Sequence, residues 1–195
     1  MYVNSFDERC LNVLTAPIPM VINDLMRSSH DRSAMAVELN EYAATLPRRV
    51  IELDGDVYLT RYAVHEPECG ERVYLHKIHR PDRDLELHDH PWEFVAHVLV
   101  GGYIEQRWQG GERVNIFRQP GTNYYCDDKT YHRIAELLAP ECWTLVITAP
   151  KTKSWSFWMP ETGVTTPWRE FVAASDRHIK AASSATVSDG HNAIL

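Results

Sequence analysis

The chain has 195 residues, of which 44% are apolar and 24% are charged, and its net charge is −7. This length allows one domain with a full hydrophobic core, and the composition is that of an ordinary globular protein. The acidic balance, with no dense Lys/Arg run, predicts that neither nucleic acid nor a membrane is a partner. We expect a cytoplasmic protein, because the N-terminus lacks a secretory pattern and the four scattered cysteines show no C-x-x-C spacing.

The sustained helical signal lies within residues 1–47, which we expect to form an N-terminal helical arm. Apolar side chains recur there every three to four residues, at Met35, Leu39, Tyr42 and Leu46. Ser29 or Asp31 is suited to cap this helix, and Pro47 stops it. A further apolar stretch, residues 20–26, precedes it.

Residues 48–171 change to short β-rich runs separated by turn residues. The runs are RVIEL, DVYLTRYAV, RVYLHKIHR, EFVAHVLV, GYIEQRW, RVNIF, HRIAEL and WTLVITA. Such spacing, without intervening helices, predicts an all-β antiparallel sandwich or barrel, and a closed barrel would remove the sheet edges. For residues 172–195 we expect a short helix from about Ala173 to Ala182 and a flexible C-terminal tail.

Six of the ten histidines fall between residues 76 and 132, and the densest group is the run HDHPWE. On a strand, His88 and His90 point the same way, so both imidazoles can reach one point inside a barrel. A bulge at Pro91 would bring Glu93 onto that face, and His132 offers a third imidazole. Such a set holds one divalent metal and leaves coordination positions open for catalysis.

Other side chains near these histidines are candidates for catalysis. Trp92 follows the histidine pair directly, and Tyr125 and Tyr131 precede His132. A tyrosine hydroxyl near a metal can donate a hydrogen bond to substrate, although each ring can equally serve packing. Arg61 and Arg107 lie in predicted strands, where they either bind a substrate carboxylate or phosphate or face solvent.

The run His88, His90, Glu93 and a following glycine resembles the first motif of the cupin superfamily. Its second motif, a Pro-Gly turn followed by one histidine, resembles Pro120-Gly121 and His132. The resemblance implies a cupin-type jelly-roll barrel with a metal centre. Glu93 follows His90 more closely than in the family pattern, and His132 follows Gly121 at a longer distance. A three-histidine centre, as in the thiol dioxygenase branch, is therefore an alternative to one with Glu93.

A longer resemblance runs from about residue 58 to residue 171, to cupin-like proteins of bacteria and phages. It rests on YLHKIHRPDRDLELHDHPWEF, GGY, HRI, WTLVITAPKTKSWSFW and PWREF. It implies the fold and the metal centre but no particular reaction. Because cupins commonly pair, a homodimer is expected.

Four functions fit these observations. The favoured one is an Fe(II) oxygenase that acts on a small-molecule substrate. The second is an isomerase or lyase assisted by Zn, Ni or Mn. The third is a non-enzymatic metal- or ligand-binding accessory protein. The fourth is a metal-free sugar epimerase that uses a histidine as base.

Overall fold

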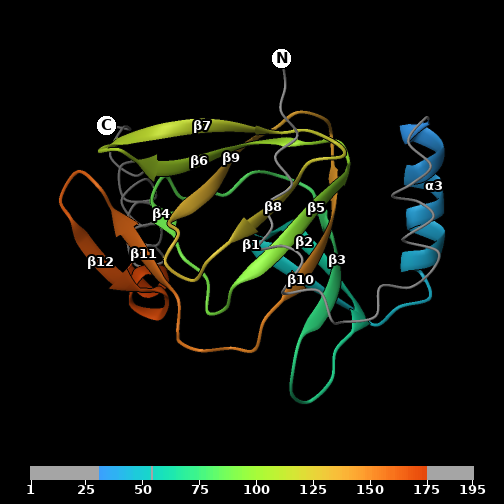
Figure 1. Cartoon of the computed structure of the whole chain (residues 1–195), viewed down its shortest axis with the longest axis horizontal. Coiled ribbons are helices and arrows are strands. Elements are labelled where there is room, and N and C mark those ends of the chain that lie inside the picture. The colour runs from blue at the N-terminus through green and yellow to red at the C-terminus, as the bar shows by residue number, and fades with distance from the viewer. Residues whose placement is uncertain (1–30, 54, 175–195) are drawn as a thin grey trace, which may run out of the picture.

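The computed structural model describes residues 31–53 and 55–174, which form one helix, α3 (Arg32–Ala43), twelve strands and a helical turn at residues 168–174 (Figure 1). The strands are β1 (Arg48–Leu53), β2 (Asp56–His65), β3 (Arg72–Ile78), β4 (Leu87–His88), β5 (Phe94–Val100), β6 (Tyr103–Gln109), β7 (Glu112–Arg118), β8 (Asn123–Cys126), β9 (His132–Leu137), β10 (Cys142–Thr148), β11 (Ser156–Met159) and β12 (Val164–Pro167). None of the helices in these residues is long and apolar enough to cross a membrane.

The expected helix is present as α3. Asp31 caps it, because its carboxylate accepts hydrogen bonds from the backbone N–H groups of Ser33 (2.9 Å) and Ala34 (3.1 Å). The buried side chains Met35 and Leu39 follow the predicted periodicity. The helix ends at Ala43, before Pro47. The predicted segment at residues 20–26 and most of the predicted C-terminal segment lie outside the described residues.

The strands form two antiparallel sheets of six strands each. Sheet A has the order β1-β2-β3-β10-β5-β8, and sheet B has the order β12-β11-β4-β9-β6-β7. All eight predicted strands are present, and β4, β8, β11 and β12 are additional short ones. This is the expected all-β jelly-roll arrangement, with one difference: within the described residues no ladder joins the two sheets, so each keeps two edge strands instead of closing.

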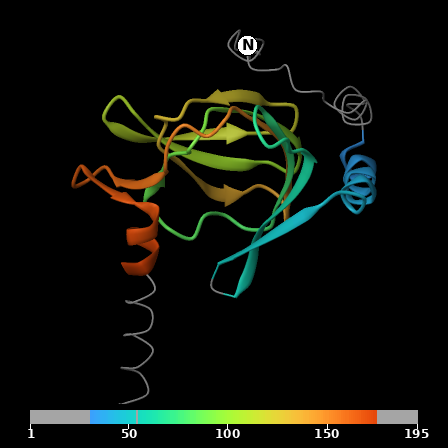
Figure 2. The same cartoon turned by 90° about the horizontal axis from the view of Figure 1, so that it is seen from below.

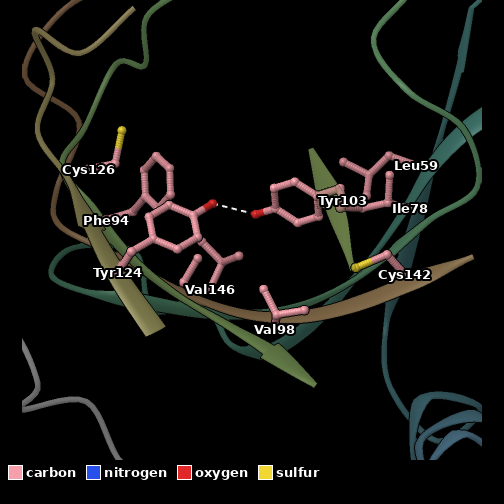
Figure 3. Packing of buried hydrophobic residues seen from close by; sticks show 10 residues of the cluster. Leu59, Ile78, Phe94, Val98, Tyr103, Tyr124, Cys126, Cys142 and Val146 are labelled. Atoms are coloured by element: carbon pink, nitrogen blue, oxygen red, sulfur yellow. Dashed lines mark hydrogen bonds between the residues drawn. The ribbon is translucent and has the colours of Figure 1, made fainter. Parts of the chain in front are cut away.

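Alternating side chains on sheet A supply two separate cores. The outer core packs against α3, which lies outside the sheets at the side opposite the β11–β12 hairpin (Figure 2). Its largest members include Leu39, Leu75 and Trp143. The inner core lies between the sheets and consists of Leu59, Ile78, Phe94, Ala96, Val98, Tyr103, Tyr124, Cys126, Cys142 and Val146. Figure 3 shows Tyr103 and Tyr124 in this core, with their hydroxyl groups hydrogen-bonded to each other.

The turn between β5 and β6 brings two backbone segments into close contact. Gly101 has a φ angle of +82°, and a Cβ atom there would collide with the backbone carbonyl of Glu141. Only glycine meets both conditions, because it adopts positive φ readily and has no side chain. Gly101 therefore both forms the turn and lets the backbone at Glu141, just before β10, lie close to it.

We predict that Gly101→Ala lowers the free energy of unfolding by about 1–3 kcal/mol, as measured by denaturant unfolding. Gly111→Ala is the matched control, because Gly111 has a similar φ angle of +92° with no atom within 4 Å of the added Cβ. The control should lose clearly less stability. Equal losses in both variants would contradict the close approach at Gly101.

Candidate metal centre

Strand pairing brings His88 next to His132. The single register pair between β4 and β9 is His88↔His132, and His90 follows β4 by two residues. One ring nitrogen of each of the three histidines lies within 4.8 Å of the others. The Nε2 atoms of His90 and His132 are 2.6 Å apart. The structure therefore brings together the three histidines that the sequence singled out.

Asp89, between the two histidines of the H-x-H run, turns away from them and anchors this segment. Its carboxylate accepts hydrogen bonds from the backbone N–H of Ser156 and from Nζ of Lys153, both at 2.6 Å. The residue is only 3% exposed. Because neighbouring side chains in an extended segment alternate in direction, fixing Asp89 against β11 turns His88 and His90 toward the interior. The sequence alone indicated no role for Asp89.

Glu105 on β6 fixes the orientation of His132. Its fully buried carboxylate lies 2.6 Å from Nδ1 of His132 and also accepts hydrogen bonds from Nε of Arg107 (2.8 Å) and of Arg118 (2.7 Å). Burial alone would raise the pKa of Glu105, but the hydrogen bond and charge of His132 and the two arginines lower the pKa to about 2. An ionised carboxylate only accepts hydrogen bonds, so Nδ1 of His132 carries the proton and Nε2 is left as the ligand atom.

His88 has a weaker carboxylate partner. Its Nδ1 atom lies 3.9 Å from Asp82, which is itself held by the backbone N–H of Ile134 (2.6 Å) and by the Tyr58 hydroxyl. Burial lowers the pKa of His88 to about 4 and lowers the pKa of His90 well below its usual value. Both imidazoles are therefore neutral at pH 7, which is the form that binds a metal ion.

This donor set fits a metal ion. Three imidazoles converge, one of them orients its ligand atom through a buried carboxylate, and nitrogen ligands suit iron, zinc, nickel and copper. His88, His90 and His132 would hold the ion. Glu93 is not part of this group, and its backbone carbonyl accepts a hydrogen bond from Ala149. A ligand role for Glu93 stays a prediction.

Aromatic rings surround the three histidines. The Phe94 ring lies 4.9 Å from His90, and the rings of Trp155 and Phe157 lie 5.8 Å and 6.0 Å from His88. Such rings exclude water from two sides of the imidazole group and keep its surroundings apolar. No sequence pattern indicated that Trp155 and Phe157 would lie against His88.

The three predicted catalytic residues lie in different places. Trp92 is half-buried and packs against the inner core. The Tyr131 hydroxyl lies 3.3 Å from Oγ of Ser156, and its ring packs against Trp158. Tyr131 also lines a cavity of about 380 Å³ whose other lining residues are Arg107, Trp108, Gln109, Asp127, Lys129, Thr130 and Trp158.

Tyr125 lies on the opposite face of β8 from its neighbours Tyr124 and Cys126, which belong to the inner core. The ring of Tyr124 lies 6.2 Å from the Phe94 ring, and the Arg118 guanidinium lies 3.9 Å from its centre. Catalytic roles for Trp92, Tyr125 and Tyr131 stay predictions.

Two antiparallel sheets with three histidines converging between them fit the jelly roll that the sequence predicted. The fold is of the cupin type. No family model and no curated protein matches the sequence. Among solved structures, the chain is similar to the DMSP lyase DddQ from Ruegeria pomeroyi, with 15% identity, 71% of this chain and 76% of that chain covered, and a TM-score of 0.47.

Two further similar structures are enzymes with other names. One is the hydroxypropylphosphonic acid epoxidase from S. wedmorenis, with 11% identity, 55% and 56% of the two chains covered, and a TM-score of 0.42. The other is an oxalate decarboxylase, with 13% identity, 73% of this chain and 35% of that chain covered, and a TM-score of 0.46. At these identities no activity is carried over to this chain.

We predict that Glu105→Gln weakens Zn(II) binding by about 10- to 100-fold, because the amide accepts the His132 proton less strongly and leaves two arginine charges uncompensated. Competition with a chelating dye measures the dissociation constant. Glu112→Gln, an exposed position on β7, is the control and should bind as the unaltered chain does. Unchanged zinc affinity in a folded Glu105→Gln variant would refute the role of Glu105.

Proposed function

We propose that this cupin is a mononuclear metal-dependent enzyme and, more narrowly, an Fe(II)-dependent oxygenase of a small-molecule substrate. The observation that carries the proposal is the group of three imidazole nitrogens within 4.8 Å of one another. Three protein ligands leave coordination positions free, whereas structural sites are usually closed by four. Under this proposal the chain acts in the cytoplasm as a homodimer.

The residues around the group support catalysis in distinct ways. Glu105 holds the proton at Nδ1 of His132, so the ligand nitrogen stays fixed during turnover. Phe94, Trp155 and Phe157 exclude water from the sides they cover. Iron bound to the histidines would supply one-electron and dioxygen chemistry. The imidazoles also suit zinc and nickel, which would support the isomerase or lyase alternative.

The first test is metal content. After anaerobic incubation with Fe(II) and desalting, elemental mass spectrometry should find about one iron per chain, a stoichiometry that follows from one facial ligand set. His88→Ala and His132→Ala should lose it. His65→Ala, at the end of β2 and outside the group, should retain it. Retention of iron in both ligand variants would contradict this site.

The second test is oxygen consumption by the Fe(II)-loaded protein across small thiols and carboxylic acids. The proposal predicts uptake that requires Fe(II) and a product mass increased by oxygen atoms. Turnover of a substrate without oxygen would favour the isomerase or lyase. Full metal occupancy with no turnover of any kind across the panel would favour the non-enzymatic accessory protein.

A further inference from the structure

A second polar cluster lies inside the molecule, on β2 and β3. The sheet register places Arg61 opposite His76, and Nε of Arg61 donates a hydrogen bond to Nε2 of His76 at 3.1 Å. The Arg61 guanidinium also lies 5.0 Å from the centre of the Tyr74 ring. The proposed function uses none of these three residues.

Strand alternation directs this cluster toward the space between the sheets. Leu59, two residues before Arg61, and Ile78, two residues after His76, both belong to the inner core. By contrast, Tyr62 and Leu75, adjacent to Arg61 and His76, pack in the outer core beneath α3. Arg61 and His76 therefore face the interior that holds the three histidines.

Arg61 is a half-buried cation without a carboxylate partner among the described residues. In the described parts of the chain, no carboxylate oxygen lies within 4.0 Å of its guanidinium, and Glu66 accepts a hydrogen bond from the Tyr74 hydroxyl at 2.6 Å. Burial lowers the pKa of Arg61, with Arg49 adding to the effect and Glu66 opposing it. Arg107 and Arg118 differ in this respect, because Glu105 pairs with both.

The two terminal nitrogens of Arg61 are available to a ligand. They donate no hydrogen bond to the residues that the structure describes, because only Nε is used, toward His76. They are also accessible to solvent, whereas Nε of Arg72 and Nη2 of Arg107 are buried and have no hydrogen-bond partner. With Nε fixed and the Tyr74 ring beneath the guanidinium, one edge of the arginine fork is held ready for a planar anion.

The cluster borders the same inner core as the histidines. Leu59 and Ile78, which lie two residues from Arg61 and His76 on β2 and β3, share this core with Phe94, whose ring lies 4.9 Å from the His90 ring. An anion on Arg61 would thus lie in the space between the sheets that also holds the histidines. Charge complementarity is favourable, since the site would gain the counterion that the described protein residues do not provide.

We propose that Arg61, positioned by His76 and Tyr74, binds the carboxylate of a small organic acid and presents the rest of that molecule to the three histidines. This inference deepens the proposed function, because it names a substrate class for the same site. Carboxylate binding at Arg61 does not itself require the metal. Either the anion site or the metal-dependent function can therefore be wrong while the other is right.

Binding of propionate, compared with the uncharged isostere propionamide, tests the proposal. NMR titration of the metal-free full-length chain isolates Arg61 from direct coordination of the anion by a metal. Propionate should bind at least tenfold more tightly than propionamide. Arg61→Met should weaken propionate binding at least tenfold. Arg61→Lys should weaken propionate binding less, because lysine keeps the positive charge but lacks the planar guanidinium that donates two hydrogen bonds to a carboxylate.

Arg48→Met is the control, because Arg48 is an exposed arginine on β1 of the same sheet and its loss changes the net charge equally. It should bind propionate within twofold of the unaltered chain. Equal affinities for propionate and propionamide, or an unchanged propionate affinity in Arg61→Met, would overturn the proposal. If Arg61→Met does not fold, the isostere comparison and Arg61→Lys decide the question.

The Zn(II)-loaded chain separates this inference from the proposed function. Arg61→Met should retain full zinc occupancy while losing propionate binding. Loss of zinc binding in the same variant would overturn the assignment of Arg61 to the substrate. A chain that binds propionate through Arg61 but takes up no metal would contradict the proposed function and leave the anion site standing.

Discussion

The buried carboxylate of Glu105 is the interaction on which the candidate site depends. An ionised carboxylate taken out of water is strongly destabilising unless other groups compensate its charge. Here His132, Arg107 and Arg118 all bond to it, and both arginines also lie against the Tyr124 ring, at 5.5 Å and 3.9 Å. Strands β6, β7 and β9 are thereby joined to the inner core, and the ligand atom of His132 is set by the same contact.

The interior thus has two halves of different electrostatic character. Around Glu105 every charge has a partner within the protein. The guanidinium of Arg61, by contrast, bonds to the neutral side chain of His76 and has no carboxylate partner among the described residues. The fully paired cluster around Glu105 holds His132 rigidly. The positive charge of Arg61, which lacks a carboxylate partner, attracts an anionic molecule. In the two proposals made above, the Glu105 cluster serves the metal site and Arg61 serves the substrate.

Sequence patterns predicted the parts of the structure that depend on local chemistry. The long strands follow alternation and turn residues, α3 follows its apolar spacing and cap, and the H-x-H run places two imidazoles together. The parts that depend on register could not be read in this way. Glu105 is 27 residues from His132 and meets it only because β6 pairs with β9, whereas Glu93 is near in sequence and outside the group.

Short strands and strand parity account for the remaining differences. Strands β4 and β11 have two and four residues, too few for an alternation pattern, so the contact of Asp89 with Ser156 had no sequence signal. On β8, a shift of one residue exchanges Tyr125 for Tyr124 as the inward side chain. The sequence did not show which face of the sheet Arg61 lies on. In the structure Leu59, two residues earlier on β2, belongs to the inner core, so Arg61 lies on the inner face.

The most direct test of the central claim is X-ray absorption spectroscopy at the iron edge of the Fe(II)-loaded chain, because it counts the ligands themselves. We expect the nearest neighbours of the iron to be nitrogen and oxygen atoms, with the multiple-scattering pattern of three imidazoles. We also expect His132→Ala to reduce this pattern or to abolish iron binding. A shell with one imidazole or none, or one dominated by sulfur, would contradict a centre built from His88, His90 and His132.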